Sequence, residues 1–359
     1  MRKIYRETKY IRHSLRVSRK ALKRRLRKKL KEKVFHRSIQ GKPLSEVRNL
    51  KGRLSSFEIT APIKFEFLEH PEESTKFINL LESILKANRR VFVDMSKVEV
   101  IDHGAIASLL SVMFKFKSRK IDFNGNFPLN PEAARVVRES GFIFHLFENN
   151  SNKTKYTIGA TNQMLTQVDE KLDPGLVDIV VQDSSISVWN SPQSCKGLYR
   201  VIIELIDNTR EHAPYKKRER GSERWWLCIN HDKANKKVSF VFLDYGIGIF
   251  ASLADKPADH PISRLAKGWA QSFGMSASGE HLKSLVTTKL YETSSSKEGR
   301  GLGIYGIGQT MGRNQISNLH IISNNAYGNV DKKQYRRLNT GFNGTLFYWE
   351  LCYNNEHQK

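Results

Sequence analysis

From about residue 55 onward, short apolar segments alternate with amphipathic segments of helical length, and this alternation constrains the fold most strongly. The apolar run Arg89–Met95 has the pattern of a buried strand and lies between the helical patterns Glu72–Ala87 and Asp102–Lys115. A further helix is expected over Pro131–Ser140, ended by Gly141 as a capping residue. Strands that alternate with helices predict an α/β layer structure.

The second half of the chain shows the same mixture. Its expected elements are the helix Gly197–Ala213, the strands Trp225–Asn230 and Val238–Asp244, the helix Ile304–Arg313, and the strands Leu319–Ser323 and Gly344–Cys352. The stretch 150–178 is polar and contains Asp173-Pro-Gly, so it is expected to be a linker. We therefore predict two α/β domains, at 55–158 and 175–355.

The first 53 residues differ in charge from the rest of the chain. The formal net charge is +24, and about +18 of it lies in residues 1–53. Leu15, Leu22, Leu26 and Leu30 recur there at spacings of seven and four, which predicts a basic helix with a narrow apolar stripe. The basic character therefore describes an N-terminal arm at 1–53.

Several classes of protein are disfavoured by composition. No apolar run approaches the ~20 residues of a transmembrane helix, and no apolar segment follows the basic N-terminus as in a secretory signal. The three cysteines are scattered without a CxxC pair, which argues against a disulfide framework and a zinc site. A cytoplasmic location is the resulting expectation.

Four segments of the second half have residue types suited to nucleotide chemistry. In the first, Glu204 and Asn208 stand four residues apart and therefore share a helical face. An amide oxygen is a suitable ligand for Mg²⁺, and a carboxylate one turn earlier could orient or deprotonate a nucleophile. An ordinary amphipathic surface helix would show the same pair.

The second segment, Asp244-Tyr-Gly-Ile-Gly, directly follows an apolar strand. A carboxylate at a strand end can accept a hydrogen bond from an exocyclic amine, and Gly246 and Gly248 let the backbone approach a planar base. A simple turn is the alternative interpretation.

The third segment is a glycine-rich turn that opens a helix. Its residues are Arg300, Gly301, Leu302 and Gly303. Such a turn presents unpaired N–H groups to phosphate, and the arginine adds a charge-assisted contact. The fourth segment, Gly344-Thr345, places a hydroxyl at the start of the last expected strand.

In their order and spacing, these segments resemble the N, G1, G2 and G3 boxes of the GHKL ATPase superfamily, which includes gyrase, MutL and histidine kinases. The resemblance covers about 175–355 and implies a Bergerat-type α/β sandwich that binds ATP with Mg²⁺. It implies that Glu204 is the catalytic base or water-orienting residue and that Asn208 binds Mg²⁺. It also implies that Asp244 and Thr345 contact adenine and that the box glycines and neighbours contact the nucleotide.

The expected function is Mg²⁺-dependent ATP binding and hydrolysis, with closure of an ATP lid signalling to a protein partner. The lid would be the segment between Gly248 and Gly299, which is long enough to hold an extra helix near Gly279–Tyr291. Two alternatives stay open. One is a protein kinase of the anti-sigma-factor (serine) or histidine type, and the other is a non-catalytic nucleotide-gated scaffold. A homodimer is also compatible with the sequence.

The middle region, over Val91–Leu110, resembles the STAS domain, the fold of the anti-sigma-factor antagonists. Asp94 and Asp102 fit the family pattern, whereas His103 and Gly104 replace its two serines. The family's phosphoacceptor serine falls on Gly104, so phosphorylation at that position is not available. The complete expectation is a basic helical arm, a STAS-like α/β domain and a Bergerat-type domain.

The arm allows three partners. It could bind nucleic acid through the phosphate backbone, lie on an anionic membrane surface, or dock an acidic protein. Its few aromatic residues make base-specific stacking doubtful. Nucleic acid is the favoured partner of residues 1–53.

Overall fold

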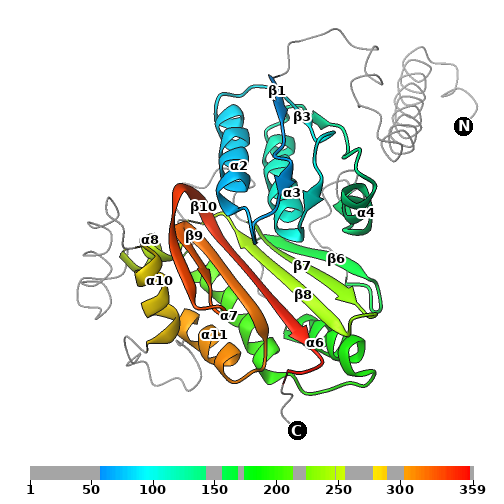
Figure 1. The fold of residues 1–359 in the computed structure, drawn as a ribbon, viewed down its shortest axis with the longest axis vertical. Coiled ribbons are helices and arrows are strands. Elements are labelled where there is room, and N and C mark those ends of the chain that lie inside the picture. The colour runs from blue at the N-terminus through cyan, green and yellow to red at the C-terminus, as the bar shows by residue number, and fades with distance from the viewer. Residues whose placement is uncertain are drawn as a thin grey trace, which may run out of the picture.

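The computed structural model describes residues 57–142, 156–168, 174–212, 224–246, 248–254, 278–288 and 303–355. The arm at 1–53, with its leucine stripe, lies outside these residues. Within them the chain is a mixture of helices and sheets, which confirms the α/β class (Figure 1). No helix of the described ranges is long and apolar enough to cross a bilayer.

An N-terminal unit is built on a small parallel sheet with the strand order β1-β3-β5. Its elements are β1 (Phe57–Thr60), β2 (Lys64–Phe65), α2 (Pro71–Lys86), β3 (Val91–Asp94), β4 (Val100–Ile101), α3 (His103–Ser118), β5 (Phe123–Gly125) and α4 (Pro131–Glu139). The apolar residues of α2 and α3 share one buried cluster with the strands. Gly141 follows α4 with a φ of 77°, as its capping role predicts.

Helix α3 begins at a half-buried carboxylate. Asp102 accepts hydrogen bonds from the backbone N–H groups of Ala105 at 2.7 Å, Phe67 at 2.6 Å and Leu68 at 3.2 Å. Burial nevertheless raises the pKa of Asp102 to about 6. The next turn holds Gly104, where an added Cβ would lie 3.4 Å from Leu346 Cδ1 of the C-terminal unit. Gly104 therefore lies at the junction of the two units.

The C-terminal unit contains a five-stranded antiparallel sheet with the order β6-β7-β8-β10-β9. Its strands are β6 (Asn162–Val168), β7 (Arg224–Asp232), β8 (Lys237–Asp244), β9 (Ser317–Asn329) and β10 (Gln334–Cys352). Its helices are α6 (Pro174–Trp189), α7 (Lys196–His212), α8 (Ile249–Ala254), α10 (Ser278–Thr287) and α11 (Gly303–Gly312).

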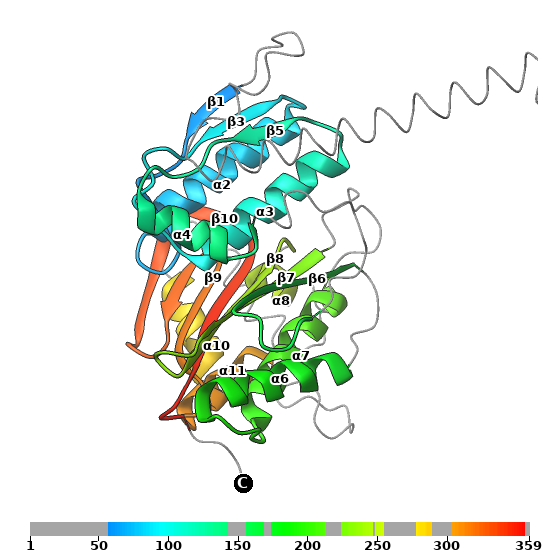
Figure 2. The same ribbon diagram turned by 90° about the vertical axis from the view of Figure 1, so that its right-hand side faces the viewer.

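The two faces of this sheet have different coverings. Successive side chains of a strand point to opposite faces, so Phe240 and Phe242 pack in the cluster formed with α6, α7, α10 and α11. Val241 and Leu243 pack instead in the cluster that includes α2 and α3. Figure 2 shows the sheet between the N-terminal unit on one side and α6 and α7 on the other. We call these the helical face and the docking face.

Polar contacts as well as apolar packing hold the N-terminal unit on the docking face. The Glu72 carboxylate accepts from the backbone N–H groups of Asn339 at 2.5 Å and Thr340 at 3.2 Å. The Tyr327 hydroxyl donates to the Leu68 carbonyl over 2.8 Å. Because these contacts join α2 and its entry loop to β9 and β10, the two units share one interface.

A buried ion pair lies at the centre of that interface. Lys115 Nζ of α3 lies 2.7 Å from Glu82 Oε1 of α2 and 3.6 Å from the centroid of the Tyr245 ring. Asn343 Nδ2 donates to the other Glu82 oxygen over 2.8 Å. Burial lowers the pKa of Lys115, and the Glu82 charge opposes that shift.

Some sequence expectations about local structure are wrong. The stretch 150–178 is not a simple linker, because β6 pairs with β7 along its whole length and α6 begins at Pro174. The last two strands form a hairpin much longer than expected, so Thr345 lies well inside β10 rather than at its start. The extra helix expected near Gly279–Tyr291 is present as α10.

Candidate functional site

Asp244 ends β8 on the helical face of the sheet. It points to the same side as Phe242, because the two residues stand at positions i and i+2 of the strand. The side chain keeps partial exposure, yet the surrounding protein raises the pKa of its carboxyl to about 6. The Gly246 N–H donates to Asp244 Oδ1 over 2.7 Å and opposes part of this rise.

The two carboxyls with a pKa near 6 differ in how many hydrogen bonds they accept. Asp102 accepts three backbone N–H groups, as expected of a structural cap. Within the described residues, the Gly246 N–H is the one donor to Asp244. A carboxylate offers about four acceptor positions, so Asp244 retains capacity for a ligand that donates hydrogen bonds.

A pair of hydroxyls lies beside Asp244 on the same face. Thr345 of β10 is the register partner of Asp244 in β8 and of Ser323 in β9. The Ser323 and Thr345 hydroxyl oxygens are 3.2 Å apart, and Ser323 Oγ also accepts from the Ile249 N–H over 2.9 Å. Sequence reasoning missed Ser323, because a single serine near a strand end carries no signal without the register.

Two glycines leave no room for side chains around this corner. Gly248 has a φ of 81°, and an added Cβ would collide with the Asn324 carboxamide. Gly344 has a φ of 134°, and an added Cβ would collide with the Asp244 carbonyl oxygen. Both positions combine left-handed backbone with close approach, so glycine is required there for structural reasons as well.

Helix α7 carries the two remaining polar candidates of the sequence prediction. Its buried side packs on the helical face through Leu198, Val201, Ile202, Leu205 and Ile206. Glu204 and Asn208 are half-buried and stand one turn apart on the same helix. The helix therefore brings a carboxylate and an amide to the side of the sheet that carries Asp244.

Helix α11 also belongs to this face and begins at Gly303. The φ of Gly303 is 46°, and no atom lies within 4 Å of an added Cβ, so conformation rather than packing favours glycine. Gly197 of α7 packs against Thr310 of α11 and against Gln315, which makes the two helices neighbours. The other residues of this predicted segment, Arg300, Gly301 and Leu302, lie outside the described residues.

The structure thus gathers part of the predicted set at one sheet corner. The residues gathered there are Asp244, Gly246, Gly248 and Thr345. Glu204, Asn208 and Gly303 lie on helices that share the helical face. In the described ranges, no three His, Cys, Asp or Glu side chains gather as a metal site. A single amide such as Asn208 fits Mg²⁺ only if most other ligands are water and phosphate oxygens.

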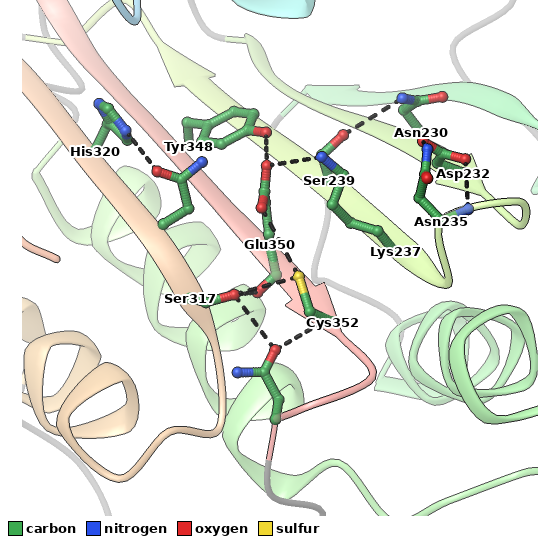
Figure 3. Close-up of polar contacts among 12 residues, drawn as sticks. Asn230, Asp232, Asn235, Lys237, Ser239, Ser317, His320, Tyr348, Glu350 and Cys352 are labelled. Atoms are coloured by element: carbon green, nitrogen blue, oxygen red, sulfur yellow. Dashed lines mark hydrogen bonds and ion pairs between the residues drawn. The ribbon is translucent and has the colours of Figure 1, made fainter.

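A second polar network lies on the docking face and was not expected from the sequence (Figure 3). The Tyr348 hydroxyl donates to Glu350 Oε1, which also accepts from Lys237 Nζ over 3.3 Å. Glu350 is nearly buried and is neutralised by these donors. Because the members satisfy one another, this network is a structural feature of the sheet.

Comparison with known protein families, curated proteins and solved structures finds no match to this chain.

Proposed function

We propose that the corner formed by β8 and β10 binds the adenine of ATP, and that the C-terminal unit hydrolyses the bound nucleotide with Mg²⁺. The observation that supports this most directly is the pairing of Asp244 with Thr345 on the helical face. Asp244 keeps hydrogen-bond capacity although its carboxyl lies in dense protein surroundings. A side chain at the left-handed Gly248 or Gly344 beside it would collide with neighbouring atoms, so the backbone is closely packed at this corner.

In this proposal the Asp244 carboxylate accepts a hydrogen bond from the exocyclic amine of adenine. Thr345 contacts the adjacent edge of the base, either directly or through water. Gly246 and Gly248 allow the base to lie against the backbone. With a pKa of about 6, Asp244 is mainly ionised at pH 7 and above, which is the state that accepts the amine.

The phosphate end of the nucleotide would lie toward α7 and α11. Asn208 holds the cation through its amide oxygen, and bound Mg²⁺ supplies charge neutralisation of the phosphates. Glu204 orients the attacking water and accepts its proton. Gly303 leaves the first N–H groups of α11 open to phosphate. Arg300, Gly301 and Leu302 complete this turn in the proposal.

The nucleotide state would be signalled by closure of the segment between Gly248 and Gly299. Transfer of the phosphate to a protein, or binding without turnover, are the two competing activities. Hydrolysis, phosphate transfer and binding without turnover would all use the same adenine corner. They differ only in the fate of the γ-phosphate.

Three substitutions separate these activities in calorimetry and phosphate-release assays. Asp244→Asn should weaken ATP binding at least about tenfold, because the adenine amine loses its anionic acceptor. Asp178→Asn, on the exposed side of α6, is the matched control and should leave binding unchanged. Undiminished binding by Asp244→Asn would contradict the adenine assignment.

Glu204→Ala should retain ATP binding and lower turnover by about 10²-fold or more. Asn208→Ala should weaken only the Mg²⁺-dependent part of binding. Wild-type protein that labels a partner from γ-labelled ATP without releasing phosphate would favour the kinase. Protein that binds ATP and does neither would favour the scaffold.

We also propose that residues 1–53 bind nucleic acid through its phosphates. The support is the charge of about +18 concentrated there. Binding should weaken steeply as salt rises, because neutralised phosphates release counterions. Removal of 1–53 should weaken binding to DNA or RNA strongly and leave ATP binding intact. Binding to anionic vesicles but not to nucleic acid would favour the membrane surface instead.

A further inference from the structure

The N-terminal unit has a strongly basic edge at the end of its sheet where β1, β3 and β5 begin. Two turns form this edge, one between α2 and β3 and the other between α3 and β5. The two turns and the last residues of α2 and α3 carry six cationic residues, namely Lys86, Arg89, Arg90, Lys117, Arg119 and Lys120. Asp122 is the one acidic residue within these two turns. We call this surface the basic edge.

The two turns form one continuous surface. Strands β3 and β5 are parallel neighbours, and Val91 pairs with Phe123 where each strand begins. The Val91 N–H donates to the Asp122 carbonyl over 3.2 Å. Arg119 Nη1 donates to the Leu85 carbonyl over 3.3 Å, which ties the second turn to the end of α2. The backbone of the two turns is therefore held together by the sheet and by the contact of Arg119 with α2.

An ion pair on the edge compensates part of this charge. The Arg90 guanidinium lies 3.7 Å from the Asp122 carboxylate, and both side chains are about half exposed. Lys86, Arg89 and Lys120 are also exposed. Cations at the ends of α2 and α3 complement the helix dipoles, but each dipole amounts to only about half a charge. The surface thus keeps a net positive charge.

The chain enters the sheet at this same edge. Phe57 opens β1, and its N–H donates to the Arg90 carbonyl over 2.9 Å. In the sequence, residues 1–53 with a charge of about +18 directly precede this point. Figure 1 shows the start of β1 beside the start of β3, at the end of the N-terminal unit away from the large sheet.

We propose that the basic edge is a second phosphate-binding surface, which binds the sugar-phosphate backbone of a nucleic acid. A surface with several exposed cations can contact backbone phosphates and needs no base contacts. It extends the binding proposed for residues 1–53 but uses residues of the folded unit. It shares no residue with the nucleotide corner, so its failure would not bear on ATP binding.

A nucleic acid fits this edge better than a membrane surface does. Among the described residues of the edge, Phe57 is the one large apolar side chain that is exposed, at 48 %. The Arg89 guanidinium lies over its ring, 5.2 Å from the centroid. Stable binding to a bilayer surface usually needs buried apolar area in addition to charge. The basic edge offers charge without such an anchor.

The test uses the full-length chain and two triple variants of equal charge. One is Lys86→Gln, Arg89→Gln and Lys120→Gln, and the other removes three exposed lysines from turns of the C-terminal unit. These control changes are Lys233→Gln, Lys332→Gln and Lys333→Gln. Affinities for a short duplex DNA, the matching single strand and a duplex RNA are measured over a salt series by fluorescence anisotropy. The three probes identify which backbone geometry the edge prefers.

The edge variant should bind the preferred probe about tenfold more weakly at moderate salt. Each lost phosphate contact should also reduce the salt slope by about 0.9 for a duplex. The control variant should change affinity less than about twofold. Equal losses in both variants, an unchanged slope, or no binding by the wild-type chain would overturn the proposal.

Lysine acetylation of the wild-type chain provides a second measurement that does not depend on substitutions. Nucleic acid should protect Lys86 and Lys120 but not Lys233 or Lys332. Equal reaction of Lys86 and Lys120 with and without nucleic acid would overturn the proposal. Protection of these two lysines by phosphatidylserine vesicles but not by nucleic acid would also overturn the proposal.

Discussion

The helical face and the docking face of the five-stranded sheet are held by different kinds of contact. On the helical face, the rings of Phe240 and Trp349 stack with centroids 5.2 Å apart and an interplanar angle of 5°. On the docking face, an aromatic edge contact between Phe114 and Trp226 accompanies the buried Lys115–Glu82 pair. Close packing of apolar side chains holds the helices on the helical face. On the docking face, a buried ion pair must also keep its geometry.

This difference matters because the end of β8 contributes to both faces. Asp244 points to the helical face, and the next residue, Tyr245, contacts the docked N-terminal unit. The Tyr245 ring lies under Lys115 Nζ, and its hydroxyl lies 3.4 Å from the Ser108 carbonyl. A displacement of α3 would therefore move Tyr245 and, through the peptide bond between them, Asp244 of the proposed adenine corner. Four predictions follow the comparison from the largest effect to the smallest.

The largest effect is expected for Trp349→Ala on the helical face. Trp349 is fully buried, so truncation should lower the free energy of unfolding by about 3–5 kcal/mol. Urea denaturation measures this change. The control is Trp349→Phe, which should cost less than about 1.5 kcal/mol. It keeps a stacked ring and removes an indole N–H that has no hydrogen-bond partner among the described residues. Equal costs would show that ring packing is not what stabilises this face.

On the docking face, Lys115→Met should lower the free energy of unfolding by about 2–3 kcal/mol, because it leaves Glu82 buried without its cation. Adding Glu82→Gln should recover much of this loss, since the glutamine can still accept the Asn343 amide. A double-mutant cycle in urea measures the coupling. Strictly additive costs would mean that the pairing of Lys115 with Glu82 does not contribute to stability.

The comparison also shows which parts of the fold local sequence can predict. Helices α2 and α4 follow from amphipathic spacing and proline at their starts, and both were expected almost to the residue. The edge strand β6 was missed, because its polar residues outnumber its apolar ones and the segment therefore resembles a linker. Helix α6 was missed because apolar residues lie all round it, including the exposed Ile179 and Ile186.

The candidate site likewise contains residues that the sequence could predict and residues that it could not. Asp244, Gly246 and Gly248 could be proposed from the sequence because a carboxylate and two glycines follow an apolar strand directly. Ser323 could not, because its relation to Thr345 depends on the pairing of β9 with β10. The packing of α2 and α3 on the sheet could not be predicted either. It depends on tertiary contacts between two units that the sequence presents as separate domains.

A pH effect should distinguish the proposed site from its surroundings. The pKa of Asp244 is raised to about 6 in the folded chain, so the folded state retains a proton that the unfolded state releases. Stability should therefore fall as the pH rises from about 4 through 6, by about 1–2 kcal/mol after allowance for its partial exposure. Asp244→Asn should remove this part of the pH dependence. Urea titrations at pH 4.5, 6 and 7.5 would show whether the two proteins diverge, and parallel curves would contradict the assignment.

The smallest effect is expected for Tyr245→Phe, which tests whether the hydroxyl or the ring carries the contact between the faces. The hydroxyl lies 3.4 Å from the Ser108 carbonyl, longer than a typical O–H···O bond, and should contribute less than about 0.5 kcal/mol. Burial raises the pKa of Tyr245, so the hydroxyl stays neutral and adds no charge beside Lys115.

The ring itself should matter more, because Lys115 Nζ packs on it at 3.6 Å. Tyr245→Leu should therefore destabilise the chain measurably and weaken ATP binding several-fold, whereas Tyr245→Phe should leave both near wild type in urea denaturation and calorimetry. Tyr348→Phe is the matched control, since its hydroxyl donates to Glu350 and its loss should cost more than that of Tyr245. If Tyr245→Phe weakened ATP binding while stability stayed unchanged, the hydroxyl rather than the ring would link the docking face to the adenine corner.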